Sequence, residues 1–308
     1  LTLIPNAVAS HVEVDDAGKC RSVYYIDRVT RTHREVYGKA VVLCASTLES
    51  TRIMLNSTSP RYPTGIANSS GVLGHYLMDH VMGGGASGIL PVLKGVPDTR
   101  GNRPNGVYIP RFRNLEERHP DFLRGYGYQG SANIVKWGHA INIPGFGADF
   151  KQQIRDTRPW SISIGGFGEH LPRYENFCEL DKIHVDAWGI PVLHISAAYG
   201  DNEKAMINDM ADAAEEMLRA AGAEDIEVER EVSAPGLAIH EVGTARMGAD
   251  PTTSVLNSYE QAHDVSNLFV MDGSGYPSSS CQNPTITFMA LATRACEYLV
   301  EEFRASRI

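Results

Sequence analysis

The sequence of 308 residues predicts an α/β fold of mixed α+β character, divided into two domains. The first observation is an amino-terminal hairpin that leads into an apolar strand, a tight turn and a helix over residues 1–57. The second is a middle region, residues 80–200, in which short strand-like pieces alternate with turns and polar stretches. The third is a pair of helical patterns, starting near 201 and 284, each with an apolar stripe.

The amino-terminal elements justify the first observation. The stretch LTLIPNAVASHVEVDDAGKCRSVYYIDR predicts two strands joined by an Asp-x-Gly turn at 16–18. Residues 40–44 (AVVLC) form a continuous apolar run, which predicts a strand covered on both faces. The stretch TLESTRIMLNS then predicts a short helix, capped by Thr47 or Ser50. This order of elements is typical of the end of a nucleotide-binding fold.

The middle region predicts an antiparallel sheet with long loops. Its strand-like pieces include GVYIPRF, WSISIGGF and IPVLHISAA. The stretch RYENFCELDKIHVDAWG predicts a strand, a turn and a second strand, with Trp188 in the core. A helix capped by Asp201 and Asn202 follows and ends at Gly222. Its apolar stripe predicts packing against the sheet and consists of Met206, Ile207, Met210, Ala214, Met217, Leu218 and Ala221.

Composition limits the classes of function. The formal net charge is −9, and no basic face stands out, so neither nucleic acid nor an anionic membrane is an expected partner. No apolar run approaches the length of about 18 residues that a membrane span needs. The five cysteines include no C-x-x-C pair, so they predict neither a disulfide framework nor a zinc site. A soluble protein is expected, and the compartment, cytoplasmic or periplasmic, stays open.

One glycine-rich stretch imitates a phosphate-binding motif. GGGASG at 83–88 formally matches G-x-G-x-x-G. The motif binds a pyrophosphate only where a helix follows it, and here Pro91 follows within ILPVL. We therefore interpret this stretch as a flexible or close-packed strand.

The stretch DGSGYPSSSCQNPTITFMALATRA contains the most informative local pattern. A long run of small residues precedes Asn283 and Pro284, which are a candidate cap and first residue of an apolar helix that we expect to be largely buried. The free N–H groups at such a helix start favour an anionic or electron-rich ligand group. A plain helix cap is the alternative, but the length of the loop favours a ligand lying against backbone.

Histidines offer two further candidates. His240, within AIHEVGTARMG, is either a structural residue or a proton acceptor, since imidazole is the side chain best suited to take a proton near neutral pH. His75, Asp79 and His80 lie close together in sequence, but the sequence points to no further ligand for a metal. Surface or core polar residues are the favoured interpretation, and a metal hydrolase is a remote alternative.

Taken together, these pieces resemble the glucose–methanol–choline (GMC) family of flavin oxidoreductases. HEVGTARMG and NLFVMDGSGYPSSSCQNPTITFMALATRA look like the two carboxy-terminal motifs of that family, in order and at fitting spacing. The resemblance covers about 1–80 and 170–308 and is weak over 80–165. WGIPVLHI and CQNPTITFMAL look most like the branch that acts on sugars and glycosides, including glucoside 3-dehydrogenases and pyranose oxidases.

The resemblance implies roles for particular residues. His240 matches the catalytic histidine of the family, and Asn283 matches the second member of the catalytic pair. The implied cofactor is FAD, and the positions that match its surroundings are Ala9, Ala45, Asp272, Gly273, Pro284 and Thr285. The family pattern after the buried strand is Ala-Gly, whereas this sequence has Cys44-Ala45-Ser46-Thr47. The expected reaction oxidises an alcohol, on a sugar or glycoside, by proton transfer to His240 and hydride transfer to flavin N5.

The resemblance also implies an organisation into domains. Residues 1–78 and 234–308 would form an incomplete, Rossmann-like FAD-binding domain, and residues 79–233 a substrate-binding domain. Family members carry G-x-G-x-x-G near their amino terminus, and this sequence lacks it, so a missing amino-terminal segment or a companion chain is implied. The 308 residues alone are then expected to bind FAD weakly and to be inactive. A non-catalytic or partner-dependent binding module on the same scaffold is the alternative function.

Overall fold

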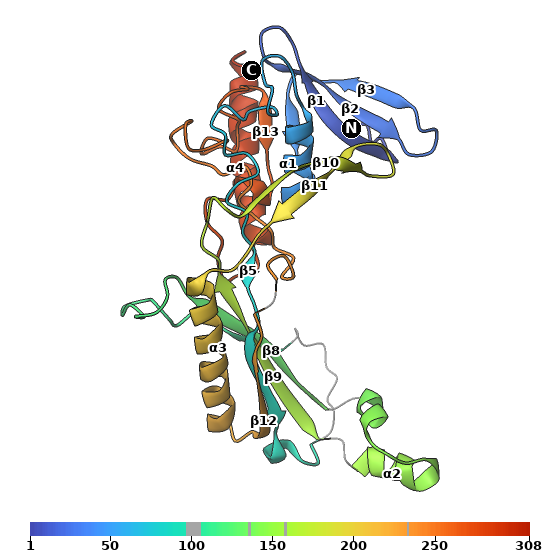
Figure 1. Ribbon diagram of the computed structural model, residues 1–308, viewed down its shortest axis with the longest axis vertical. Helices are drawn as coiled ribbons and strands as arrows, with labels where there is room; N and C mark the ends of the chain where they lie inside the picture. The colour runs from blue at the N-terminus through green and yellow to red at the C-terminus, as the bar shows by residue number, and fades with distance from the viewer. Residues whose placement is uncertain (97–105, 135–136, 157–158, 233) are drawn as a thin grey trace. The chain divides into compact units, whose positions relative to one another are not determined.

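The computed structural model describes residues 1–96, 106–134, 137–156, 159–232 and 234–308 (Figure 1). The chain forms two compact units. The first unit comprises residues 1–80, 170–198 and 238–308, and the second comprises 81–169 and 199–237. The predicted boundaries at 78 and 234 lie close to those of the units. The segment 170–198, which the sequence assigned to the second domain, packs with the first unit.

The first unit opens with a three-stranded antiparallel sheet in the order β1-β2-β3. Its strands are β1 (Ala7–Val14), β2 (Cys20–Asp27) and β3 (His33–Tyr37). The turn between β1 and β2 is the predicted one, and the Gly18 N–H donates to the Asp15 carbonyl at 2.9 Å. Gly18 has a φ of 81°, which glycine adopts without steric cost.

The first unit also contains a parallel pair of strands. β4 (Val41–Leu43) pairs with β13 (Leu268–Val270), and α1 (Thr47–Asn56) begins just after β4. The residue at the cap of α1 is Ser46, one position before the predicted Thr47. Val41 and Leu43 are buried, but Val42 is exposed, so the prediction of a strand covered on both faces is wrong within the described chain. Val42 lies on the same face as its ladder partner Phe269, which the carboxy-terminal helix covers, but Val42 itself is 44% exposed.

A second hairpin consists of β10 (Phe177–Val185) and β11 (Pro191–Ser196). Trp188, in the turn between them, was predicted to be a core residue, and this is wrong because the side chain is only half buried. Its ring lies flat under the guanidinium of Arg31, whose Cζ is 4.2 Å from the ring centroid. The hairpin turn projects Trp188 outward, and the cation covers one of its faces.

The first unit ends with a short 3₁₀ helix, η3 (Gly273–Gly275), and the long helix α4 (Thr285–Arg304). The prediction that α4 is largely buried is wrong, since only Ala295 and Glu302 are buried among its residues, all of which the structure describes. Ile286 is 77% exposed and Met289 65% exposed. One stripe of α4 packs on Phe269 and its neighbours, and the opposite apolar stripe faces away from every described element of this unit.

The second unit is built on the predicted antiparallel sheet, in the order β12-β6-β9-β8-β7, with β5 also pairing β9. Its strands are β5 (His80–Val81), β6 (Gly84–Ile89), β7 (Val107–Ile109), β8 (Tyr126–Ile134), β9 (Trp160–Glu169) and β12 (Glu224–Arg230). The first residue of β5, His80, belongs to the first unit, and Val81 to the second. The helices outside the sheet are η1 (Pro91–Leu93), η2 (Trp137–Asn142), α2 (Gly147–Asp156) and α3 (Asp201–Ala220).

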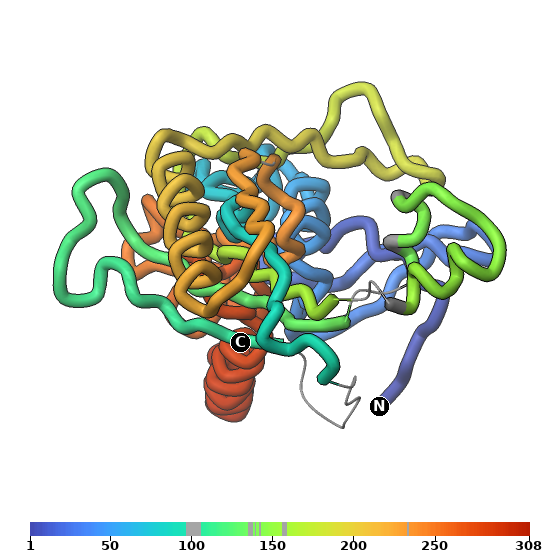
Figure 2. Tube along the Cα trace, turned by 90° about the horizontal axis from the view of Figure 1, so that it is seen from below, coloured from blue at the N-terminus to red at the C-terminus, as the bar shows by residue number. Residues whose placement is uncertain are grey.

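α3 covers one face of this sheet, and Figure 2 shows it, in gold, beside the strands. Gly200 takes the cap position, one residue before the predicted Asp201, and its N–H donates to the Glu203 carboxylate at 2.9 Å. The predicted methionine-rich stripe is buried against the sheet, except near its end, where Met217 is half-buried and Ala221, at the C-cap, is exposed. GGGASG lies mostly in β6, where a Cβ on Gly84 would come within 2.5 Å of the Ile207 carbonyl oxygen. Close packing on α3 therefore requires glycine, which confirms the strand interpretation.

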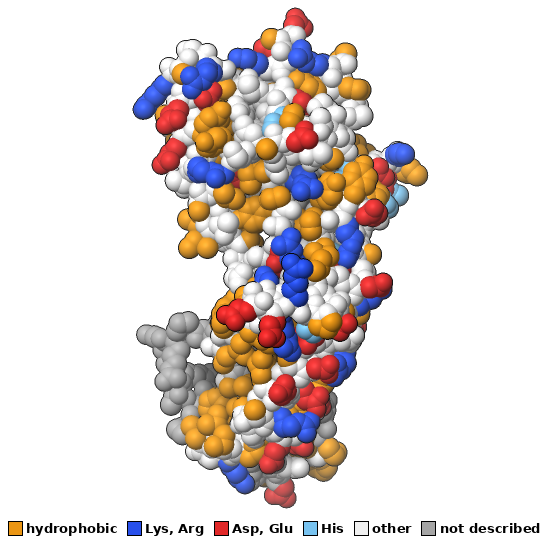
Figure 3. All heavy atoms as spheres, turned by 90° about the vertical axis from the view of Figure 1, so that its left-hand side faces the viewer, with side chains coloured by type: hydrophobic (Ala, Val, Ile, Leu, Met, Phe, Trp, Pro, Cys, Tyr) orange, Lys and Arg blue, Asp and Glu red, His pale blue; other side chains and the backbone are white. Residues whose placement is uncertain are grey.

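The charged surface agrees with the composition. Acidic and basic side chains are mixed over the face shown in Figure 3. Among the residues that the structure describes, no helix is both long and apolar enough to cross a membrane.

Candidate active site

A cavity of about 280 Å³ lies within the first unit. Three segments form its wall, namely the start of β5, the loop after residue 239, and the chain from the end of η3 into α4. The lining residues are His80, His240, Val242, Met247, Tyr276, Pro277, Ser278, Ser279, Ser280, Gln282, Asn283, Pro284, Thr287 and Leu291. The polar wall thus combines two imidazoles, two carboxamides and several hydroxyl groups.

The cavity brings together the two predicted catalytic residues. His240 and Asn283 both line it, although 43 positions separate them in the sequence. Pro284 lines it too, whereas Thr285 is exposed at the start of α4 and is not part of the wall. Small residues between η3 and Asn283 let the backbone itself form part of the surface.

The start of α4 differs by one residue from the prediction. Pro284 takes the cap position with φ −85° and ψ −10°, and α4 begins at Thr285, so the prediction of Asn283 as cap is wrong. The dihedral angles of Pro284 are already helical, which shifts the boundary. No side chain caps this end of α4. Its first N–H groups are therefore available to a ligand.

His240 is the group on the cavity wall that best suits proton transfer. Its Nδ1 is buried and has no hydrogen-bond partner among the described residues, and His240 lines the cavity. We infer that Nε2 is the ring nitrogen that a ligand in the cavity meets. Burial raises the pKa of the neighbouring Tyr276 to about 12, so that phenol stays neutral near physiological pH. Both ring nitrogens of His80 are covered by surrounding atoms.

His80 was not among the predicted site residues, yet it lies beside His240. The two rings meet edge to face, with centroids 4.9 Å apart and an interplanar angle of 89°. Asp79 and His80 are both buried, which agrees with the favoured interpretation of core polar residues. His75 instead stacks on Tyr174, with ring centroids 3.8 Å apart. Within the described chain, no three His, Cys, Asp or Glu residues form a metal-binding group.

A second cluster of predicted residues lies at the carboxyl ends of β4 and β13. The Ala45 N–H donates to the Ser50 hydroxyl at 3.0 Å, and that hydroxyl donates to the Asp272 carboxylate at 2.5 Å. The Gly243 N–H donates to the Gly273 carbonyl at 3.1 Å, which connects this cluster to the loop that carries His240. Carboxyl ends of adjacent parallel strands are the usual ligand-binding edge of α/β folds.

Ala9 lies apart from this cluster, on an exposed position of β1. Ser10 follows Ala9 in β1, and its carbonyl accepts a hydrogen bond at 2.9 Å from the side chain of Asn56, at the end of α1. Ala45 precedes the other end of α1, so a ligand that reached both positions would extend over about 15 Å, the length of a ten-residue helix. Within β1, Ala9 pairs with Tyr25 of β2, and the described residues show no hydrogen bond between Ala9 and the other predicted site residues.

Glu260 is a site neighbour that sequence reasoning missed. It is 1% exposed, and its Oε2 has no hydrogen-bond partner among the described residues. Burial, with a contribution from Asp272, raises its pKa to about 7, and Arg294 opposes the shift. No local pattern in SYEQAHDV distinguishes this glutamate from a surface residue.

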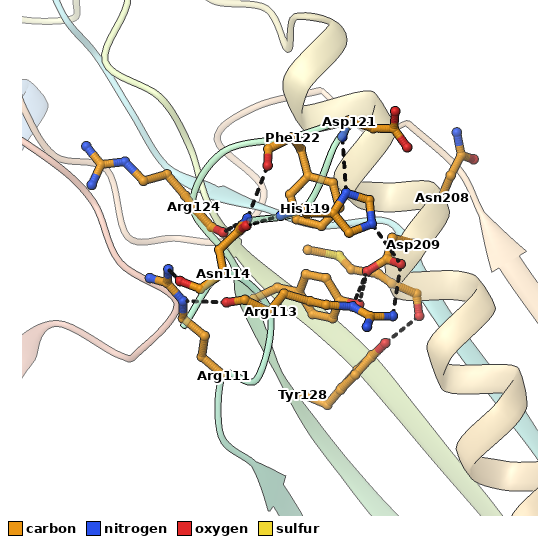
Figure 4. A network of polar contacts seen from close by, with 12 residues as sticks. Arg111, Arg113, Asn114, His119, Asp121, Phe122, Arg124, Tyr128, Asn208 and Asp209 are labelled. Carbon is orange, nitrogen blue, oxygen red and sulfur yellow. Dashed lines mark hydrogen bonds and ion pairs between the residues drawn. The ribbon is translucent and has the colours of Figure 1, made fainter. Parts of the chain in front are cut away.

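The second unit contains a polar network of a different kind, shown in Figure 4. The Arg113 guanidinium donates twice to the Asp209 carboxylate on α3, at 2.8 and 3.0 Å. The Asn114 side-chain amide stabilises the surrounding loop, because it donates hydrogen bonds to the carbonyls of Phe122 and Arg124. Each member of the network has its partners within the second unit, so a structural role suffices.

Comparison with known proteins gives a consistent result. Residues 172–292 match the family model described as GMC oxidoreductase. Over 296 residues the chain is 33% identical to the 2-methyl-1,2-propanediol dehydrogenase of Mycolicibacterium austroafricanum, a match that covers 93% of this chain and 52% of the relative. It is 28% identical over 304 residues to the fructose dehydrogenase large subunit of Gluconobacter japonicus, which covers 98% of this chain and 54% of that protein.

A solved structure matches as well. The pyridoxine 4-oxidase from Mesorbium loti aligns with 95% of this chain and 57% of its own, with a TM-score of 0.61 and 19% identity. At that identity the match shows a shared fold. The chain spans about half the length of the curated relatives it matches.

Proposed function

The chain belongs to the GMC oxidoreductase family, and from this premise we propose that it forms part of an FAD-dependent enzyme that oxidises an alcohol to a carbonyl compound. The proposed substrate is a hydroxyl group of a sugar, a glycoside or a related polyol. Relatives named for 2-methyl-1,2-propanediol, fructose and C-glycosides support this class. The polar wall of the cavity also suits a ligand with several hydroxyl groups.

The residues present fit FAD. Neither α1 nor α4 has a side chain that caps its first turn, so both helix starts offer free N–H groups to an electron-rich ligand. Ala45, Asp272 and Gly273 lie together at the edge of the parallel pair, and Pro284 and Thr285 mark the start of α4. In the proposal these residues hold the cofactor together with Ala9 on β1. When bound, FAD supplies the acceptor for the hydride that leaves the alcohol carbon.

His240 and Asn283 share the handling of the alcohol in this proposal. The Nε2 atom of a neutral His240 accepts the hydroxyl proton, while the carboxamide of Asn283 donates a hydrogen bond to the same oxygen and fixes its angle. The proton therefore goes to the imidazole, and the two electrons leave the carbon with the hydride. The free N–H groups of α4 favour negative charge at their end of the cavity.

One observation carries the proposal: His240, whose buried Nδ1 has no hydrogen-bond partner in the described part of the chain, lines the same cavity as Asn283 and the start of α4. An imidazole in that position can accept a proton from a ligand in the cavity. A histidine with only a structural role would normally have its buried nitrogen bonded.

The test uses the full-length protein that contains residues 1–308, loaded with FAD. Anaerobic mixing with 2-methyl-1,2-propanediol, D-fructose or a C-glycoside should bleach the flavin absorbance near about 450 nm. His240→Ala should slow bleaching by about 100- to 10,000-fold, because a general base contributes that much, while the bound flavin is retained.

His75→Ala is the matched control, since His75 also belongs to the first unit but lies outside the cavity wall. The flavin of this variant should lose its absorbance at the wild-type rate. If His240→Ala reduces its flavin as fast as the wild type, His240 is not the base. If no alcohol bleaches the wild type, the alternative of a non-catalytic binding module on the same scaffold is favoured.

A further inference from the structure

The buried carboxylate of Asp79 contacts the backbone of both histidines of the cavity. Asp79 is 2% exposed and directly precedes β5. Its Oδ1 accepts hydrogen bonds from the backbone N–H groups of His80 at 2.7 Å and His240 at 3.1 Å. Its Oδ2 accepts one from the N–H of Ala238 at 2.9 Å. One side chain therefore fixes the backbone of both histidines, although 161 positions separate Asp79 from His240.

A strained residue lies between two of these donors. Ile239 has a φ of 59°, in the left-handed region, where a β-branched residue is a clear outlier. Its side chain is 78% exposed, so packing of that side chain does not hold it there. Ala238 and His240, on either side, donate to different oxygens of Asp79. The carboxylate therefore holds the turn in this conformation.

The direction of the His240 ring depends on this turn. His80, nearly fully buried, gives a fixed surface on one side, and the His240 ring meets it edge to face. The backbone after His240 is held at Val242, which exchanges hydrogen bonds with Met78. On the other side, the backbone of His240 and the turn before it are held by Asp79. If the turn relaxed toward an ordinary conformation, the backbone of His240 would rotate and Nε2 would leave its place on the cavity wall. Small misplacements of a reacting group cost large factors in rate.

We propose that Asp79 is the positioning residue of this site: it holds the left-handed turn at Ile239 and thereby aims the His240 imidazole at the substrate oxygen. The inference rests on the proposed alcohol oxidation. Asp79 acts through the backbone of residues 238–240 and does not itself meet the substrate. Its carboxylate is needed because both of its oxygens accept, and a carboxamide of the same size has only one accepting oxygen.

The test compares Asp79→Asn with the wild type in the full-length, FAD-loaded protein. Without substrate, the amide hydrogens of Ala238 and His240 should exchange with solvent about tenfold faster, because their acceptor is weakened. With 2-methyl-1,2-propanediol or D-fructose, flavin reduction should slow by about 10- to 100-fold, while KM changes by less than about threefold.

A rescue separates positioning from general damage. Asparagine tolerates the left-handed region far better than isoleucine, so Ile239→Asn lowers the strain that Asp79 must hold. Added to Asp79→Asn, it should recover about tenfold of the lost reduction rate. Asp186→Asn is the matched control, because Asp186 also holds two backbone N–H groups, those of Trp188 and Ile190, away from the cavity. It should reduce flavin at the wild-type rate.

The outcomes distinguish the two proposals. If the wild type oxidises a probe and Asp79→Asn oxidises it equally fast, the positioning role is wrong while the proposed function holds. Slow reduction that Ile239→Asn does not rescue also overturns it. If the wild type oxidises no probe, the proposed function fails. Unchanged amide exchange at Ala238 and His240 in Asp79→Asn overturns the Asp79 inference in either case.

Discussion

Asp79 in the first unit and Asp209 in the second are both central carboxylates, but their donors differ. Asp79 accepts from three backbone N–H groups of two distant segments. Asp209 accepts from side chains. The Arg113 guanidinium donates to it twice (Figure 4), and the Tyr126 hydroxyl donates to it as well. A carboxylate bound by backbone fixes the path of the chain, whereas one bound by side chains fixes the packing of an element. The first arrangement suits a site, and the second suits a scaffold.

The surroundings of the two carboxylates follow the same division. Around Asp79 the chain is mostly loop, with a left-handed residue at 239 and a cavity beside it. Asp209 itself lies on the regular helix α3, with fully buried tyrosines beneath it, and only its Arg113 partner comes from a loop among the partners named above. Burial, followed by the hydrogen bond to Asp209, raises the pKa of Tyr126, so that its hydroxyl stays a donor to the carboxylate. Substitution of Asp79 should accordingly disturb the geometry of the site in the first unit. Substitution of Asp209 should lower the free energy of unfolding.

The largest expected effect is at Asp209. Asp209→Ala leaves the partly exposed Arg113 guanidinium and the buried Tyr126 hydroxyl without their acceptor, which should lower the free energy of unfolding by about 2–4 kcal/mol. Urea denaturation of the purified protein measures it. Asp212→Ala, on the same helix with an exposed side chain paired to Arg230, should cost less than about 1 kcal/mol. Equal losses in the two variants would show that the network adds nothing to the packing of α3.

Glycine packing beneath α3 gives the next largest effect. Gly84→Ala places a Cβ within 2.5 Å of the Ile207 carbonyl oxygen and of the Met210 Cβ. The helix must move away from the sheet, at a cost of about 1–3 kcal/mol in a urea titration. Gly165→Ala, in the neighbouring strand β9, meets no atom within 4 Å and should be neutral. A neutral Gly84→Ala would contradict the close approach of α3 to β6.

These contrasts explain what the sequence could predict. The stripe of α3, the hairpin turn at Gly18 and the strand nature of GGGASG depend on local periodicity and turn chemistry, and the structure confirms each. The same periodicity identified the apolar residues of α4, but it does not show which of them another element covers. Ile286 and Met289 are exposed in the structure. Periodicity describes one face of an element, and burial depends on a second element.

The site was predictable only in part for a related reason. The family motifs named His240 and Asn283, and both line the cavity. Asp79 is joined to His240 through backbone N–H groups, and every non-proline residue carries such a donor, so no side-chain pattern marks the pairing. Ile239 likewise shows nothing in sequence, because its left-handed conformation contradicts its own preference. Functional geometry of this kind becomes visible only in the folded chain.

Glu260 sharpens the comparison, since it is a buried carboxylate in the first unit whose Oε2 has no donor among the residues that the structure describes. Burial raises its pKa to about 7 from the ordinary value of 4.5. A raised folded-state pKa means that its contribution to stability is complete below pH 4.5 and is lost as the pH rises through about 7. Glu260→Gln should therefore raise the free energy of unfolding at pH 8 by about 1–2 kcal/mol, after allowance for screening by Arg294 and water.

The measurement for Glu260 is a set of urea titrations between pH 4 and pH 8, with the pH 4 data expected to show no difference from the wild type. Glu297→Gln, at an exposed position of α4, is the control and should change nothing at any pH. A Glu260→Gln variant that is no more stable than the wild type at pH 8 would show that the second oxygen of Glu260 has an adequate donor in solution.

The smallest expected effect is at Arg31, on the surface of the first unit. Here a side chain stabilises packing, as Arg113 does at Asp209 in the second unit. Arg31 covers the Trp188 ring and donates to the Ala187 carbonyl at 2.6 Å. Arg31→Lys keeps the charge and the Cβ, so any strain from the φ of 60° at this residue is unchanged. It loses the planar stack, which should lower the free energy of unfolding by about 0.5 kcal/mol, because the contact is largely exposed. A double-mutant cycle with Trp188→Leu measures the coupling, and a coupling energy of zero would mean that Arg31 stabilises the hairpin through its backbone contact alone.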